Sequence, residues 1–148
     1  EKTLLYPAGF YARRIPVAAA VQLPAGWQFA SALRGAQRAG DTVQFATVPL
    51  ETLVDSPLFA GPHYRRVELD PSSQGLVRLN IFADTKQELQ ATDEQLDKHR
   101  RIVGESIALF GSRHFREYDF LLAISDHFTG IGLERFFLSC FNCRRDRS

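Results

Sequence analysis

Apolar and polar residues alternate along the first ninety residues with the period of β-strands. Residues 15–23 form a run of small and β-branched residues that ends at the turn signal Pro24-Ala25-Gly26. The other predicted strands cover residues 27–30, 42–48, 63–69 and 76–82, and residues 34–40 read as a loop. Short strands separated by Pro and Gly turns predict an antiparallel β-sandwich or part of one.

The strand predicted over residues 76–82 indicates which of its faces is buried. Val77, Leu79 and Ile81 fall on one side of it, whereas Arg78 and Asn80 fall on the other. This pattern is typical of an antiparallel sheet with one face on the core and one face in water.

The period of the apolar residues changes at Thr92. Thr92 and Gln95 fit a capping box, which marks the start of a helix. Four apolar residues then recur on one helical face: Leu96, Val103, Ile107 and Phe110. Gly111 is placed to end the helix, and residues 118–124 form an apolar strand that only Asp119 interrupts. The predicted fold class is therefore α+β, with a boundary near Ala91.

Composition and charge exclude several classes of protein. The chain has 45% hydrophobic and 24% charged residues, as ordinary globular proteins do, and its net charge is +1. A balance so close to neutral gives no argument for a nucleic-acid partner. No apolar run approaches the roughly 18 residues that a membrane span requires, and the first residues lack the apolar core of a signal peptide.

The residues from Arg135 onward differ in character from those before them. They contain four arginines against one aspartate, and both cysteines of the chain, Cys140 and Cys143. The chain begins at Glu1 and contains no methionine. We therefore expect a processed or excised piece of a longer product that carries an atypical basic tail over residues 135–148.

Residues that could bind metal or act as nucleophiles are present but are not clustered in the sequence. The four histidines are His63, His99, His114 and His127. No His-Glu-x-x-His motif places two ligands on one helical face. Ser125, Asp126 and His127 are adjacent in an extended segment, where neighbours point to opposite sides, so they do not form a triad. We therefore predict no catalytic residue and no metal site in this chain.

Cys140 and Cys143 form a C-x-x-C motif, which is typical of half a zinc site or of a redox pair. No second pair of ligands follows it, so we interpret the motif as two exposed thiols in a short tail. A small thiol or zinc protein built around these two cysteines is one of three interpretations of the whole chain.

Four stretches of the sequence together resemble one family of enzymes. They read LLYPAGFYARRIPVAAAVQLPAGWQFA, LVDSPLFAGPHYRRVEL, RRIVGESIALFG and YDFLLAISDHFTGIGLE. In this order, over roughly residues 4–134, they are similar to the glycyl aminopeptidases, bacterial zinc metallopeptidases with a thermolysin-like catalytic domain and usually a PDZ domain. The resemblance implies that residues 1–91 are the C-terminal part of an N-terminal β domain. Residues 92–134 would then begin the catalytic domain.

The resemblance also implies a substrate site. By analogy with related aminopeptidases, Gly132 and Glu134 would lie on an edge strand beside the active-site cleft. Glu134 would bind the free α-amine of a peptide substrate through a charge-assisted contact. Gly132 would let the substrate backbone approach and pair with the strand. Zinc is the cofactor expected of the full-length enzyme, and a peptide is its substrate, in the periplasm or cytoplasm of a bacterium.

The sequence departs from the family after Glu134. Arg135 stands where the family has a histidine, and no zinc-binding motif follows. Because zinc and the motif glutamate activate water in this clan, we expect an inactive fragment of a metallopeptidase, produced by a reading-frame change or a truncation. The alternative is a non-enzymatic β-sandwich module that binds a peptide or protein. Unpaired strand edges in a truncated sandwich also predict self-association.

Overall fold

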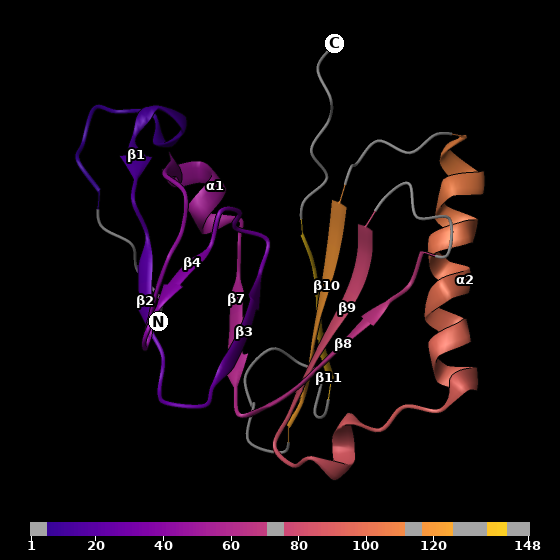
Figure 1. Cartoon of the computed structure of the whole chain (residues 1–148). Coiled ribbons are helices and arrows are strands. Elements are labelled where there is room, and N and C mark those ends of the chain that lie inside the picture. The colour runs from indigo at the N-terminus through magenta and orange to yellow at the C-terminus, as the bar shows by residue number, and fades with distance from the viewer. Residues whose placement is uncertain (1–5, 71–75, 112–116, 126–135, 142–148) are drawn as a thin grey trace.

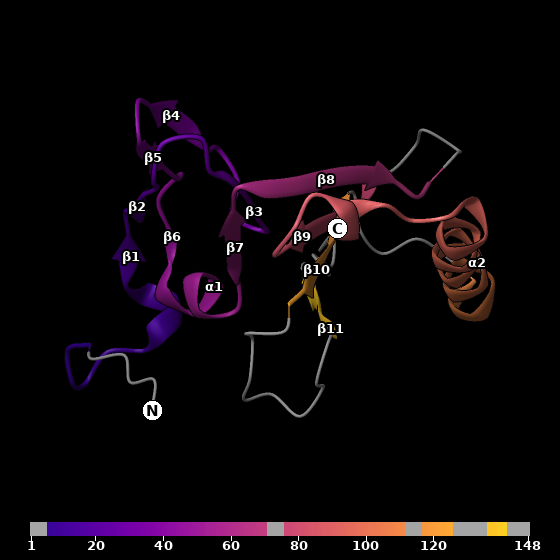
Figure 2. The same cartoon turned by 90° about the horizontal axis from the view of Figure 1, so that it is seen from below.

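A computed structural model describes residues 6–70, 76–111, 117–125 and 136–141 of the 148. Figures 1 and 2 show that these residues form three layers, which are a small β unit, a four-stranded sheet and one long helix. The fold class is α+β with mostly antiparallel strand pairs, as predicted from the sequence. Within the described ranges, none of the helices combines the length and the apolar character that crossing a membrane requires.

The small β unit is built on one long antiparallel ribbon. Strand β1 (Pro16–Val17) pairs with β6 (Val48–Pro49), and β2 (Ala20–Gln22) pairs with β5 (Thr42–Gln44). Pro16 lies opposite Pro49, whereas Ala20 lies opposite Gln44, so the register shifts by one residue between the two pairs. One extra residue on the second strand, as in a β-bulge, accounts for this shift.

A short strand adds to the far side of β5, where the sequence predicts a loop. Strand β4 (Gln37–Ala39) pairs with β5, so the loop predicted over residues 34–40 is wrong for its central part. Gly35 and Gly40 flank the strand with φ angles of +66° and +60°. Two glycines in the left-handed region turn the chain on both sides of β4, which explains the loop-like sequence pattern.

The rest of the β unit encloses a small core. Strand β3 (Gln28–Ser31) pairs with β7 (Leu58–Gly61), and two short helices, η1 (Ala12–Arg14) and α1 (Leu50–Val54), lie beside β1 and β6. The buried residues of this core are Leu23, Leu33, Val43 and Phe45, and Trp27 and Phe29 pack against them.

The central sheet has the strand order β11-β10-β9-β8. Its strands are β8 (His63–Glu68), β9 (Leu76–Ala83), β10 (Glu117–Ile124) and β11 (Phe136–Phe141). Strands β9 and β10 are parallel, and the other neighbours are antiparallel. Parallel strands need a crossover connection, and here it contains η2 (Gln87–Leu89) and α2 (Asp93–Phe110). The sheet joins strands from both sides of Ala91, where the domain boundary stays a prediction.

Helix α2 begins and ends where its sequence signals predict. The Thr92 side chain accepts from the Gln95 N–H, the Gln95 side chain accepts from the Thr92 N–H, and Gly111 follows with φ +66°. Leu96 and Val103 are buried. Phe110, predicted on the same face, is 69% exposed, because α2 extends past the ends of β9 and β10 (Figure 1).

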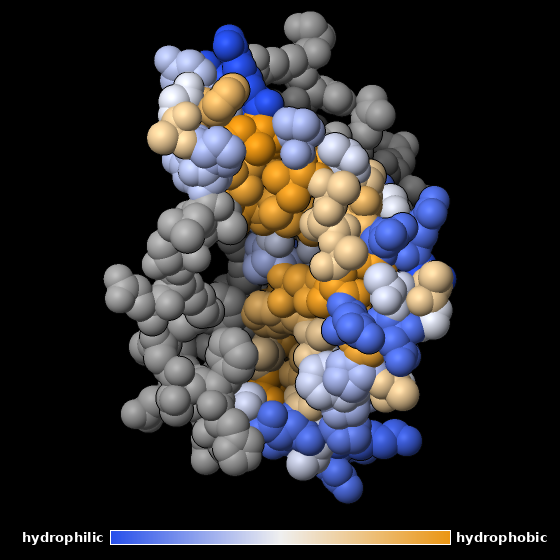
Figure 3. Space-filling model, turned by 90° about the vertical axis from the view of Figure 1, so that its left-hand side faces the viewer, coloured by the Kyte–Doolittle hydropathy of each residue, from blue (hydrophilic) through white to orange (hydrophobic). Residues whose placement is uncertain are grey.

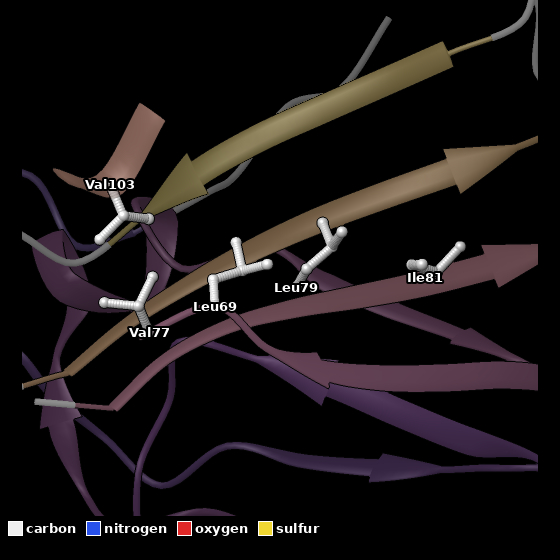
Figure 4. Packing of buried hydrophobic residues seen from close by; sticks show 5 residues of the cluster. All are labelled: Leu69, Val77, Leu79, Ile81 and Val103. Atoms are coloured by element: carbon white, nitrogen blue, oxygen red, sulfur yellow. The ribbon is translucent and has the colours of Figure 1, made fainter. Parts of the chain in front are cut away.

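The main core lies between α2 and the central sheet. Its buried members are Leu69, Val77, Leu79, Ile81 and Val103, which Figure 4 shows in close-up along β9 and below the helix. Tyr118, Phe120, Leu122 and Ile124 of β10 pack against them. The apolar face predicted for residues 76–82 is therefore confirmed.

The opposite face of the central sheet is not in water, in contrast to the prediction. Asn80 is 0% exposed. Ala30 of β3, Phe82 of β9 and Leu121 of β10 form a buried cluster across the two layers. This face of the sheet therefore packs against the β3–β7 pair through Ala30 and Phe59, a long-range contact that strand periodicity does not reveal.

Candidate functional site

The predicted substrate-binding residues Gly132 and Glu134 lie outside the described residues. The strands on both sides of them are described. Strand β10 ends at Ile124, and β11 begins at Phe136 and runs antiparallel to β10, with Ile124 opposite Phe136. Strand β11 is the outermost strand on its side of the sheet order. An edge strand therefore begins two residues after Glu134.

The central sheet holds β10 firmly in place. All eight residues of β10 have a partner on β9, from the pair Glu117–Leu76 to the pair Ile124–Ala83. Leu121 is 1% exposed. The strand that supports β11 is thus a buried, fully paired element, and sites built on such elements are positioned more accurately than sites on loops.

A charged network lies on the face of the sheet that the β unit covers. Arg78 on β9 lies between two carboxylates of β10, Glu117 and Asp119. Its Nη2 donates to Glu117 Oε2 and, at 3.2 Å, to Asp119 Oδ2, and its Nε lies 3.0 Å from Asp119 Oδ1. The side chains of Arg78 and Asp119 are 14% and 6% exposed. Such a pair is largely removed from water, so each charge depends on its partner.

The network continues along β9 and β8 through the neutral side chains of Asn80 and Tyr64 to Arg66. Asn80 Nδ2 donates to Asp119 Oδ1 at 3.1 Å and to the Phe120 carbonyl at 3.3 Å. Asn80 Oδ1 accepts from the Tyr64 hydroxyl at 2.8 Å, and Arg66 Nε donates to that hydroxyl at 2.9 Å. The fully buried amide of Asn80 thus has partners for both its oxygen and its nitrogen, as buried polar groups require.

A second arginine connects this network to the β unit. Arg34, which follows β3 in the chain, donates from Nη1 to Glu117 Oε2, and its Nη2 lies 3.6 Å from Asp119 Oδ2. Two arginines therefore balance two carboxylates. Because each carboxylate is paired with guanidinium groups, we interpret the network as a connection between two layers rather than as a catalytic pair.

An apolar pocket of about 320 Å³ opens on the other face of the sheet. It lies where η2 and the first turns of α2 meet β9 and β10. Its lining residues are Leu79, Ile81, Glu88, Leu89, Gln90, Ala91, Gln95, Leu96, His99, Leu122 and Ile124. His99 is tied to its own helix, since its Nδ1 lies 2.8 Å from the Gln95 carbonyl. The other ionisable side chain of the lining, Glu88, accepts hydrogen bonds from the Thr85 N–H and hydroxyl at 2.9 Å. The mainly apolar lining suits an apolar group.

The described residues contain no group of three or more His, Cys, Asp or Glu side chains that could hold a metal ion. His63 is on β8 and His99 is on α2. His114, His127, Asp126 and Cys143 lie outside the described residues, and only the backbone of Cys140 is described. Ser125, which the sequence places beside Asp126, donates instead to Asp84 Oδ2 at 2.8 Å.

Residues 1–62 match the family model of the Peptidase M61 N-terminal domain, the family of glycyl aminopeptidase-like enzymes. The match supports an N-terminal domain of this family over these residues. It ends just after β7 at Gly61, so it covers the small β unit and stops before β8. No curated protein matches the chain.

Proposed function

We propose that this chain is part of a glycyl aminopeptidase-like zinc metallopeptidase and that it supplies a peptide-binding edge without the zinc-dependent step. The match of residues 1–62 to the Peptidase M61 N-terminal domain is the observation that carries this proposal. The resemblance of later stretches, up to Glu134, extends it into the expected start of a thermolysin-like catalytic domain.

The order of the elements after Ala91 supports this assignment. Helix α2 is followed by β10 and then by the antiparallel edge strand β11. The resemblance implies a helix, a strand and then the strand that carries Gly132 and Glu134. Helix α2 and β10 follow this order, whereas β11 begins at Phe136, beyond that segment. In the proposed role, Glu134 binds the α-amine of a peptide, and Gly132 allows the peptide backbone to approach the sheet edge.

The residues present do not fit a catalytic zinc ion. The described residues bring no three ligands together, and the sequence contains no His-Glu-x-x-His motif. In the full-length family, zinc would polarise the scissile carbonyl and activate water. We therefore assign to these 148 residues only the binding and orientation of the peptide. A PDZ domain is likewise proposed only for the full-length enzyme.

Peptide binding tests the proposal directly. A glycyl peptide labelled at its C-terminus should bind saturably in a fluorescence anisotropy titration, and N-acetylation of the peptide should weaken binding at least about tenfold, because a charge-assisted contact is lost. Glu134→Gln should weaken binding to a similar extent. Glu105→Gln is the matched control, since Glu105 is exposed on α2.

Two outcomes would contradict the proposal. Equal affinity for the free and the acetylated peptide would remove the amine-binding role and favour the alternative, a non-enzymatic β-sandwich module. Release of glycine by the purified chain in the presence of zinc, followed by mass spectrometry, would show that binding alone is the wrong assignment.

A further inference from the structure

Three strands of the central sheet meet at the point where the predicted substrate-binding segment begins. Strands β9 and β10 run parallel, and their last pair is Ala83 with Ile124. Strand β11 begins at the same level of the sheet, because Ile124 also pairs with Phe136. Residues 125–135 therefore leave the sheet and return to it at one residue, Ile124. This residue determines where both ends of the segment lie.

Asp84, the residue after β9, is bonded to the end of β10 twice. Its N–H donates to the Ile124 carbonyl at 3.2 Å, which continues the ladder past its last pair. Its Oδ2 accepts from the Ser125 hydroxyl at 2.8 Å. One bond fixes the backbone at the end of β10, and the other fixes the first side chain beyond it. We call Asp84, Ile124 and Ser125 together the Asp84 clasp.

Asp84 is itself held in place by the elements on both sides of it. Before it, β9 is paired with β10 along its full length. After it, Glu88 Oε2 accepts from the Thr85 N–H and from the Thr85 hydroxyl, both at 2.9 Å. Arg65 Nη1 on β8 donates to the Leu89 carbonyl at 3.0 Å, which attaches η2 to the end of the sheet seen at the bottom of Figure 1. The clasp is therefore built on paired strands, which position a group more accurately than a loop does.

We propose that Asp84 is a positioning residue for the predicted amine-binding carboxylate of Glu134. Ordering a segment during binding lowers the affinity, so a segment whose ends are already fixed binds its ligand more tightly. The clasp fixes one end at Ser125, and the pairing of β10 with β11 fixes the other end at Phe136. Asp84 does not contact the peptide in this role. The inference rests on the proposed function, because it concerns the same peptide site.

The affinities for the free and the N-acetylated glycyl peptide, measured by fluorescence anisotropy, test this role. Asp84→Ala should weaken binding of the free peptide about three- to tenfold, as the loss of one hydrogen bond allows. It should leave the affinity for the acetylated peptide unchanged, because that peptide lacks the amine that Glu134 binds. Ser125→Ala removes the same hydrogen bond from the other side and should have the same effect. The double variant should bind no more weakly than either single variant, since the two residues act through one bond.

Two further variants separate positioning from other roles. Asp84→Asn keeps a side-chain oxygen that accepts from the Ser125 hydroxyl, so its affinity for the free peptide should stay within about twofold of the unaltered chain. Ser106→Ala is the matched control, since the Ser106 hydroxyl donates to the Ile102 carbonyl at 2.7 Å at an exposed position of α2. It should change neither affinity. Equal circular dichroism spectra and urea midpoints would show that all variants are folded.

The comparison of two peptides also accounts for binding to apolar surface. In Figure 3, which looks onto the side of the molecule that carries β1 and β2, apolar residues form a band with hydrophilic residues around it. Binding of the fluorescent label to this band would be the same for both peptides and for all variants. A change in the ratio of the two affinities between variants therefore reports on the amine contact.

Three outcomes would overturn the inference, and only one of them also concerns the proposed function. An unchanged ratio in folded Asp84→Ala, beside a clear preference of the unaltered chain for the free amine, would exclude the positioning role and leave amine binding intact. A loss in Asp84→Asn as large as that in Asp84→Ala would mean that the charge of Asp84 acts on the peptide. Equal affinity of the unaltered chain for both peptides would overturn this inference together with the proposed function.

Discussion

Asp119 is a charged residue within an otherwise apolar strand, and its environment explains how it is tolerated there. It accepts hydrogen bonds from Arg78 and Asn80 and is nearly inaccessible to solvent. A buried ion pair contributes little net stability compared with apolar residues of the same shape, but removing one partner leaves the other charge without compensation. The contribution of this pair to the free energy of unfolding therefore becomes measurable only when one partner is removed.

Asp119→Ala should lower the free energy of unfolding by about 3 kcal/mol, at the lower end of the range for broken buried pairs, because Glu117 still accepts from Arg78. Urea denaturation measures this change. Asp97→Ala is the matched control, since Asp97 pairs with Arg100 at a side-chain exposure of 57%. Asp97→Ala should lower the free energy of unfolding by about 0.5 kcal/mol or less. Equal losses in the two variants would contradict the buried-network interpretation.

At the scale of single elements, the signals that lie close together in the sequence predict the structure well. Thr92, Gln95 and Gly111 define the ends of α2 because each acts on backbone groups a few residues away. The strand at Gln37–Ala39 escapes prediction, because its three residues are all exposed and lie between two turn glycines. Its support comes from its pairing with β5 and from the Arg38 hydrogen bond to the Trp27 carbonyl, which no local pattern encodes.

The packing face of α2 yields a prediction for this element. Leu96→Ala should lower the free energy of unfolding by about 2 kcal/mol, because Leu96 is 5% exposed and its removal enlarges a cavity at the existing pocket. Leu109→Ala, at 80% exposure, should change it by less than about 0.5 kcal/mol. Thermal or urea unfolding of both variants checks the difference. A loss at Leu109 as large as that at Leu96 would mean that α2 packs on a different face.

At the scale of the whole molecule, the layers are connected by contacts between distant residues. Arg34 and Glu117 are 83 residues apart in sequence, and Asn80 and Asp119 are 39 apart. The sequence predicts the strands that carry Asn80 and Asp119 and singles out Asp119 as an interruption, whereas Arg34 falls in a predicted loop. It does not predict their partners, because pairing across layers depends on the assembled fold. The roles of Gly132 and Glu134 stay predictions from the family resemblance.

These connections predict that the β unit and the central sheet unfold together. Trp27, the single tryptophan, lies in the core of the β unit, so its fluorescence reports on that layer. The circular dichroism signal of α2 reports on the other layers. The two signals should have the same urea midpoint, as in a two-state transition. Separate midpoints would show that the Arg34 contacts and the cluster of Ala30, Phe82 and Leu121 do not couple the layers.

The position of β10 between β9 and β11 also has a consequence for synthesis on the ribosome. Strand β9 can pair with β8 as soon as both have emerged, but its other neighbour lies about forty residues further along the chain, as the Arg78–Asp119 separation of 41 residues indicates. Until then, the backbone N–H and C=O groups of β9 that later pair with β10 are open, and nascent chains with open strand edges aggregate readily. Slowing translation between codons 84 and 117 should therefore lower the soluble yield, and a chaperone that shields strands should restore it.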